Sequence, residues 1–121
     1  MKKIIGLTAM VAFLAVAMLA FAAPKAPTED ITIHMEGAKK PAVVFSHAKH
    51  ASVASDCKTC HHKWSGEGEP HKCESCHKAK KEGKKLDLKN ASHKTCRGCH
   101  RSLKKAGKKH GPTPCKGCHK K

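Results

Sequence analysis

The sequence predicts a small, mainly helical and irregular domain, with short helices and few strands wrapped around bound groups instead of a protein core. Two observations predict this fold class. All eight cysteines fall into four copies of the pentapeptide Cys-x-x-Cys-His. In addition, only 11 large apolar side chains follow position 22, too few to offset the conformational entropy that the chain loses on folding. Such a chain needs cofactors or covalent staples to fold.

The four pentapeptides lie at residues 57–61, 73–77, 96–100 and 115–119. In each, two thiols three residues apart share one face of a helical turn, from which they can reach the two vinyl groups of one porphyrin. The histidine that follows is then placed where it can bind the heme iron. Cys-x-x-Cys-His is the attachment sequence of c-type heme. The sequence therefore predicts four covalent c hemes, attached through Cys57, Cys60, Cys73, Cys76, Cys96, Cys99, Cys115 and Cys118.

Two other uses of the cysteines are open. Eight cysteines in a small exported chain could form four disulfides, and Cys-x-x-Cys pairs could hold zinc. Neither use requires a histidine directly after every second cysteine. The four identical pentapeptides therefore favour heme.

The first segment carries a targeting pattern. A short basic start precedes an apolar run at residues 4–21, and residues 20–22 give the small-x-small pattern of a cleavage site. An uncleaved membrane anchor is the alternative, because the run is near the lower length limit of a span. The small residues at its end favour cleavage. We predict a cleaved secretory signal peptide at residues 1–22 and one exported heme-binding domain at residues 23–121.

Histidines are in surplus over the four motifs. The motif histidines are His61, His77, His100 and His119, and the others are His34, His47, His50, His62, His71, His93 and His110. Met35 is the only methionine after the leader, so Met/His coordination is open to one heme at most. Bis-histidine coordination is the natural solution. It leaves no open site at the iron, which favours electron transfer over oxygen binding or catalysis.

Residues 43–50 are expected to form a short buried strand that turns into a helix, with Ser46 as its N-cap. His47 and His50 would then lie on one helical face and could serve two adjacent hemes. The alternative is that both are exposed polar residues. His62 follows His61 directly, points to another side of the backbone and could reach a neighbouring heme.

The remaining segments complete a single domain. We expect a loop at residues 65–70 and a lysine-rich surface segment at residues 78–90. A helix capped by Ser92 should run from His93 to about residue 106, and Gly107 should end it. Leu103 would pack on a heme from this helix.

Three segments resemble the tetraheme class III cytochromes c, the cytochrome c3 family of sulfate-reducing and related anaerobic bacteria. They are the start at residues 23–27, the Val-Val-Phe-Ser-His-Ala-Lys-His run within residues 41–50, and the doubled histidine at residues 61–62. The resemblance covers the chain from residue 23 onward. It implies four axial pairs: His47 with His61 at heme 1, His62 with His77 at heme 2, His50 with His100 at heme 3, and His93 with His119 at heme 4.

Two features depart from the family's usual pattern. The family often has four residues between the paired cysteines at hemes 2 and 4, and its distal histidine at heme 4 often lies further before the third motif than His93 does. Both features resemble the shorter triheme relatives and divergent tetraheme members of the family. His34, His71 and His110 are left over, and His71, close to Cys73, is the alternative to His93.

The chain is strongly basic, with a formal net charge of +16 that falls to +14 without Lys2 and Lys3. Seven lysines surround the fourth motif: Lys104, Lys105, Lys108, Lys109, Lys116, Lys120 and Lys121. A basic patch steers encounters with an acidic partner. The alternative is that these lysines only solvate the fold and balance the heme propionates. Nucleic acid is not expected as a partner, because the chain is exported and has few aromatic residues for stacking.

Together these features and the resemblance predict a monomeric, low-potential electron carrier of the bacterial periplasm that is not an enzyme and is not inserted in the membrane after leader removal. The resemblance implies a periplasmic hydrogenase as a donor and a membrane-bound cytochrome complex as an acceptor. The alternative function is a multiheme reductase of metal ions or sulfur species.

Overall fold

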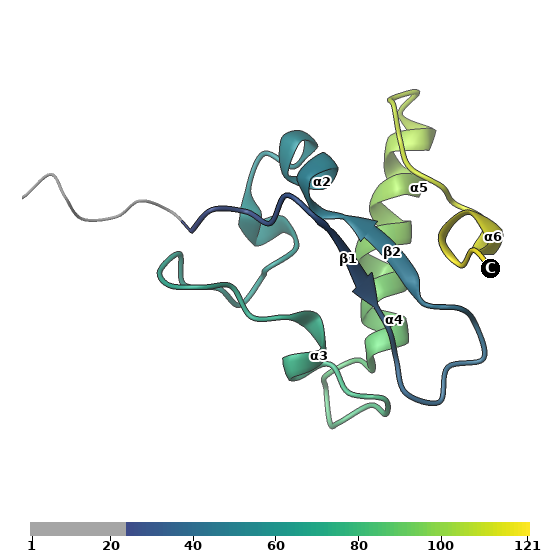
Figure 1. The fold of residues 1–121 in the computed structure, drawn as a ribbon. Helices are drawn as coiled ribbons and strands as arrows, with labels where there is room; N and C mark the ends of the chain where they lie inside the picture. The colour runs from purple at the N-terminus through teal and green to yellow at the C-terminus, as the bar shows by residue number, and fades with distance from the viewer. Residues whose placement is uncertain (1–23) are drawn as a thin grey trace, which may run out of the picture.

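The computed structural model describes residues 24–121, and the predicted signal peptide lies outside them. Figure 1 shows a short two-stranded ribbon with a longer helical rod on one side and shorter helical pieces joined by irregular chain around them. The elements in order are β1 (Asp30–Ile33), β2 (Val43–Ser46), α2 (His47–Val53), η2 (Cys57–Thr59), α3 (Cys73–Cys76), α4 (Leu88–Ser92), η3 (His93–Arg97), α5 (Gly98–Lys105) and α6 (Cys115–Cys118). The predicted fold class, short helices with few strands, is confirmed.

The two strands pair antiparallel, with Ile31 opposite Phe45 and Ile33 opposite Val43. The buried strand expected at residues 43–45 is confirmed only in part. Side chains alternate between the two faces of a strand, so Val43 and Phe45 are half-buried whereas Val44 is 67% exposed.

Helix α2 follows β2 without a connecting loop. Ser46 occupies the N-cap position, as predicted, but its side chain makes no capping hydrogen bond. Its carbonyl oxygen instead lies 2.8 Å from Nδ1 of His50. Phe45 packs against the His50 ring, with centroids 4.2 Å apart. Strand β2 thus fixes the position at which α2 begins, and with it the positions of His47 and His50.

The elements α4, η3 and α5 continue into one another as a helical rod over residues 88–105 (Figure 1). The predicted start at Ser92 is wrong. The helix begins five residues earlier, because the Asp87 carboxylate accepts a hydrogen bond from Asn90 N at 2.8 Å and caps it there.

The other end of the rod is as predicted. Gly107 has a φ of 68°, in the left-handed region that glycine adopts without strain. Lys108 N donates to Leu103 O at 2.9 Å and Gly107 N donates to Lys104 O at 3.1 Å, the pair of bonds that closes a Schellman motif.

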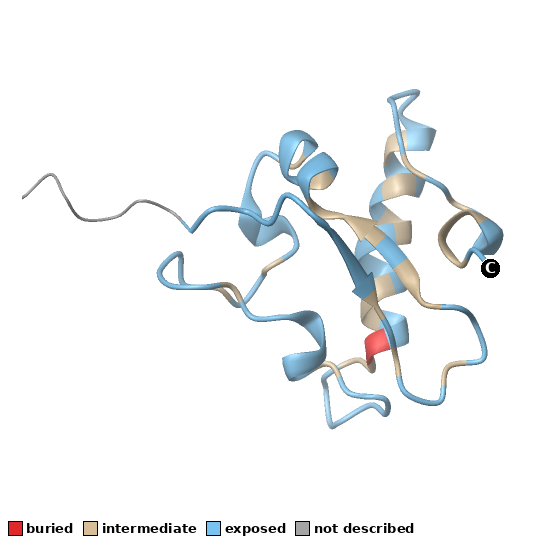
Figure 2. Ribbon diagram, in the orientation of Figure 1, coloured by how far each residue is buried: buried red, intermediate tan, exposed pale blue. Residues whose placement is uncertain are grey.

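Little of the described chain is buried by protein (Figure 2). Leu88 is the one buried residue of residues 24–121, with 4% exposure. Three large apolar side chains, Ile31, Val44 and Val53, are exposed. Apolar surface is therefore left for bound groups to cover, as the composition predicts.

The two expected irregular segments differ. Residues 65–70 form a loop in which Gly66 and Gly68 have positive φ angles. Residues 78–85 are exposed, but the predicted surface segment does not extend to residue 90, because Leu88 turns into the interior at the start of α4. In residues 24–121, no helix has the length and apolar character needed to cross a membrane.

Candidate heme-binding site

Each Cys-x-x-Cys-His motif forms a helical turn, as the spacing predicts. In the first, second and fourth motifs the histidine N–H donates to the carbonyl of the first cysteine. These bonds are His61 N to Cys57 O at 2.9 Å, His77 N to Cys73 O at 2.9 Å and His119 N to Cys115 O at 2.8 Å. The third motif spans the junction of η3 and α5 within the rod. The backbone thus holds the two thiols of each motif one turn apart.

The four motif histidines are each oriented through Nδ1 by a backbone carbonyl. The acceptors are His71 O for His61 at 3.3 Å, Leu86 O for His77 at 2.8 Å, Pro112 O for His100 at 2.8 Å and Pro41 O for His119 at 2.8 Å. A carbonyl oxygen has no proton to give, so Nδ1 must carry it. The lone pair of Nε2 is then free to bind a metal.

Four imidazole pairs occur in the structure, each joining one motif histidine to one other histidine. The ring centroids are 6.2 Å apart for His47 and His61, 6.0 Å for His62 and His77, 6.0 Å for His50 and His100, and 6.4 Å for His93 and His119. These are the same four pairs that the family resemblance implied. The rings of the last pair lie at 84° to each other, whereas the other three angles are between 24° and 37°.

This spacing fits a metal between the rings. Imidazole nitrogens bind transition metals at about 2.0–2.1 Å, so two rings on opposite sides of one metal have centres roughly 6 Å apart. Ring packing alone gives a wider spread of distances, about 4.5–7 Å. Four pairs within 0.4 Å of one another favour a common bridging group.

The leftover histidines do not enter these pairs. His71 contributes its backbone carbonyl to His61, and His110 Nδ1 lies 2.7 Å from the carbonyl of Gly111. Among the described residues it is His93, and not the alternative His71, whose ring stands next to His119.

Two elements each serve two of the four pairs. Helix α2 presents His47 to the first motif and His50 to the third. The rod carries His93, which reaches the fourth motif, and also His100 of the third. The segment η3 is a π-helix, a rare wide turn that is common at functional sites. Pairs 1, 3 and 4 are therefore linked through rigid helical pieces.

The thiols of different motifs lie near one another. All eight cysteines are unpaired thiols. Burial, and after it the nearby thiols of Cys60 and Cys73, raise the pKa of Cys96 to about 11. Burial also raises the pKa of Cys60, with Cys99 as the next cause. Cys118 also raises the pKa of Cys96, so cysteines of all four motifs lie in one region.

Sequence reasoning missed the groups that position these rings. A Cβ atom at Gly111 would lie 2.4 Å from Cε1 of His100, so only glycine lets the ring approach the backbone there. The Gly111-Pro112 dipeptide is the signal that marks this turn in the sequence. The Pro41 carbonyl that holds His119 comes from 78 residues away and leaves no local signal.

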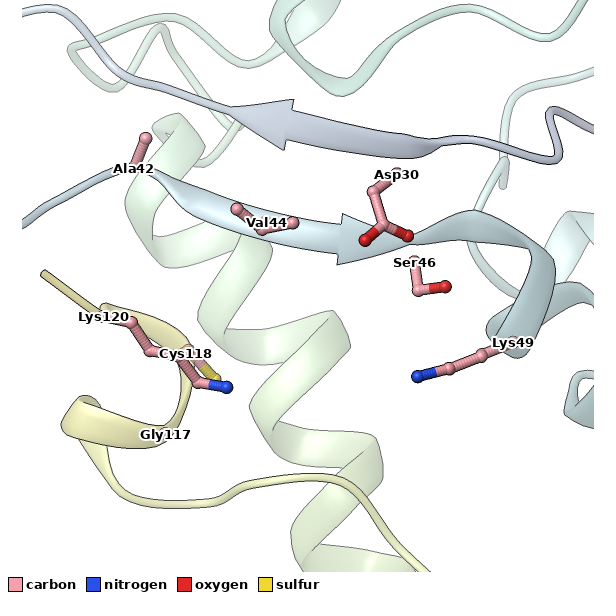
Figure 3. A pocket seen from close by; sticks show the side chains of 8 residues that line it. All are labelled: Asp30, Ala42, Val44, Ser46, Lys49, Gly117, Cys118 and Lys120. Carbon is pink, nitrogen blue, oxygen red and sulfur yellow. The ribbon is translucent and has the colours of Figure 1, made fainter.

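A cavity of about 250 Å³ lies between β2 and α6 (Figure 3). Val44 and Ala42 line it from the side of β2, and Cys118 and Gly117 from the side of α6. Lys49 and Lys120 also border it. A cysteine of the fourth motif therefore faces the exposed side of β2 across an open space.

Comparison with known proteins agrees with this site. Residues 20–119 match the model of the Class III cytochrome C family. A cytochrome c3 of Desulfovibrio desulfuricans is 45% identical over 107 residues, 79% of this chain and 97% of the relative. A cytochrome c7 of Geobacter metallireducens is 40% identical over 121 residues, the full length of both chains.

A solved structure shows the same fold. The di-tetraheme cytochrome c3 of Desulfovibrio gigas aligns with a TM-score of 0.62 and 32% identity, over 78% of this chain and 97% of its own. Proteins of this family are electron carriers with covalently attached c-type hemes. The family match and the four Cys-x-x-Cys-His turns lead to one conclusion: the chain belongs to the Class III cytochrome c family.

Proposed function

We propose that this protein carries four covalent c hemes with two axial histidines each, and that it acts as a low-potential electron carrier in the periplasm. The observation that carries the proposal is the set of four imidazole pairs at 6.0–6.4 Å. Each pair contains one motif histidine, beside the two thiols that would hold the same porphyrin. The predicted signal peptide and the attachment of c heme outside the cytoplasm support the location.

The residues around each pair restrict the chemistry. When bound, heme supplies a one-electron couple at its iron. The carbonyls that accept from Nδ1 keep the imidazoles in place and raise their basicity. With a histidine of each pair on either side, no substrate would reach the metal. The residues therefore support electron transfer without bond making at the iron.

The count of four rests on this chain's own motifs. One relative is named a cytochrome c3 and another a cytochrome c7, but the four complete motifs here each come with a distal histidine. Intact mass together with a pyridine hemochrome assay should give four hemes on a chain that starts at residue 23. A mass with three heme increments would contradict the count.

The cavity beside Cys118 supports the placement of the fourth porphyrin. A heme attached there would cover Val44, which is 67% exposed. Apolar burial contributes about 25 cal/mol per Å², so covering this strand face would stabilise the holoprotein.

The shared helical pieces support fast internal exchange of electrons. Because α2 and the rod each serve two hemes, neighbouring irons would be close, and one added electron would oppose the next through Coulomb repulsion. Redox titrations at several pH values should show coupled steps whose potentials fall as pH rises. Four independent steps without pH dependence would contradict the coupling.

The lysines around the fourth motif support an acidic redox partner, with a periplasmic hydrogenase as donor and a membrane-bound cytochrome complex as acceptor. Charge reversal at Lys104, Lys105, Lys108 and Lys109 should slow reduction by hydrogenase, and added salt should do the same because it screens exposed charges. Reversal at Lys25 and Lys39 is the matched control. If reversal at Lys80, Lys81, Lys84 and Lys85 slows transfer instead, the partner docks near heme 2.

A further inference from the structure

Two histidines on the same helix differ in their hydrogen bonds. His50 Nδ1 lies 2.8 Å from Ser46 O, a strong bond in which the ring donates. His47, three residues earlier on α2, has its Nδ1 buried from solvent and without a hydrogen-bond partner. An unpartnered buried polar atom is uncommon in folded proteins, so this one calls for a physical account.

The motif histidines that pair with them differ in the same way, in the strength of the hydrogen bond at Nδ1. His100, which pairs with His50, donates from Nδ1 to Pro112 O at 2.8 Å. Nδ1 of His61, which pairs with His47, lies 3.3 Å from His71 O, beyond the usual N–H···O hydrogen-bond range of about 2.7–3.2 Å. One pair thus has two strong bonds at Nδ1, whereas the other has one long bond and one unpartnered nitrogen.

A bond donated from Nδ1 makes an axial imidazole more basic at Nε2. A more basic ligand stabilises the ferric iron more than the ferrous iron and lowers the reduction potential. We propose that the heme held by His50 and His100 has a lower reduction potential than the heme held by His47 and His61. Of these two hemes, the one held by His47 and His61 therefore fills with electrons first. This inference rests on the bis-histidine ligation proposed above.

Two other features of the two sites, the burial of the rings and the angle between them, are similar. The four rings are all half-buried, and the interplanar angles of the two pairs are 24° and 37°. Both distal rings start from one short helix, and Lys49 stands between them on the exposed side. Phe45 differs between the two, since its ring centroid is 4.2 Å from that of His50 and 6.0 Å from that of His47, but it is unchanged in the variants tested below.

A substitution at Gly111, which lies beside the His100 ring, can weaken the Nδ1 bond of His100 without replacing any of the proposed iron ligands. A Cβ at Gly111 would lie 2.4 Å from Cε1 and 2.7 Å from Nε2 of His100. An alanine there would push the ring away from Pro112 O and weaken its bond. Gly111 is thus a positioning residue for the proposed heme 3.

The first test is made on the unaltered holoprotein. NMR redox titration, with heme methyl signals assigned by contacts to each axial ring, follows the oxidised fraction of each heme. At every intermediate potential the heme at His47 and His61 should be more reduced than the heme at His50 and His100. Equal fractions, or the reverse order, would overturn the proposal.

The second test is Gly111→Ala, with Gly98→Ala as the matched control. A Cβ at Gly98 would find His93 O at 4.0 Å, an ordinary contact, although it lies in the same motif as His100. Gly111→Ala should raise the potential of the heme at His100 and narrow its gap to the heme at His47, while Gly98→Ala leaves the gap unchanged. An unchanged gap in both variants, with all hemes bound, would overturn the role of the Nδ1 bond.

Different results would overturn the order of the two potentials and the proposed function. Four low-spin hemes that fill in the wrong order would leave the carrier function intact and remove only the inference. Fewer than four hemes, or a high-spin signal from the unaltered protein, would remove the proposed ligation itself.

Discussion

The region at residues 57–85 and the region at residues 88–119 hold two heme motifs each, but they are built differently. In the first region the motifs sit on the isolated turns η2 and α3, and most residues are exposed. In the second region the third motif lies within a continuous rod that is capped at both ends. The difference shows that a backbone hydrogen-bond ladder orders one region, while the other lacks an extended ladder of its own.

Motif histidines supply some of the missing order in the first region. His61 binds the carbonyl of His71, and His77 binds the carbonyl of Leu86. Each bond folds the loop that follows a motif back onto that motif's own imidazole. Once the imidazole is fixed by a metal, the loop is fixed with it, so heme binding and loop order are coupled.

Removing the four proposed hemes should have the largest effect and separate the two regions. In the apo chain, residues 57–85 should lose all amide-exchange protection, because no extended ladder remains there. Residues 88–105 should keep weak protection, since the rod exceeds the roughly 12–15 residues below which isolated helices are marginal. Hydrogen exchange with mass spectrometry, with the holoprotein as control, measures this. Equal protection in the two regions would refute the comparison.

Replacing one proposed distal ligand should affect one of the four proposed hemes. We expect His93→Ala to open the heme attached at Cys115 and Cys118, because its ring stands 6.4 Å from His119. A high-spin signal and carbon monoxide binding should appear for a single heme. His71→Ala is the control, because this residue lends only its carbonyl to the site. If His71→Ala opens a heme and His93→Ala does not, the assigned pair is wrong.

Truncating the one buried side chain should destabilise the rod. Leu88→Ala should lower the free energy of unfolding by about 2–5 kcal/mol, the range for a leucine removed from a packed interior. Val53→Ala, at a position that is 74% exposed, should change it by less than about 0.5 kcal/mol. Denaturant titration of the two holoproteins compares them. Similar losses in both variants would mean that heme, and not Leu88, closes the start of the rod.

Local patterns in the sequence predict local structure here, and long-range contacts have no such pattern. The motif spacing predicts the helical turns, and Gly107 marks the end of the rod. The predicted start of the rod is wrong because Asp87 and Ser92 are both residue types that cap helices well. Burial of Leu88 favours the start at Asp87. The approach of Pro41 to His119 depends on the tertiary fold alone.

The cap of the rod should give the smallest effect and a defined pH dependence. The hydrogen bond from Asn90 N lowers the pKa of Asp87, which is exposed. A lowered pKa in the folded state stabilises the protein above the unfolded pKa of about 3.9, and this contribution is lost as pH falls through the folded pKa. Asp87→Ala should therefore lower the Tm slightly at neutral pH and not at low pH. Asp56→Ala, at the cap of η2, is the control for the other region. A Tm difference that persists unchanged at low pH would contradict the cap.

The most direct test of four bis-histidine hemes in one short chain is near-infrared magnetic circular dichroism of the fully oxidised protein, scaled per chain by heme content. The two regions differ in how the chain is ordered, yet both should give the same ligation. The expected result is a low-spin bis-histidine band with an intensity of four hemes per chain. A band of lower intensity, or one with a histidine–methionine or high-spin component, would contradict the account.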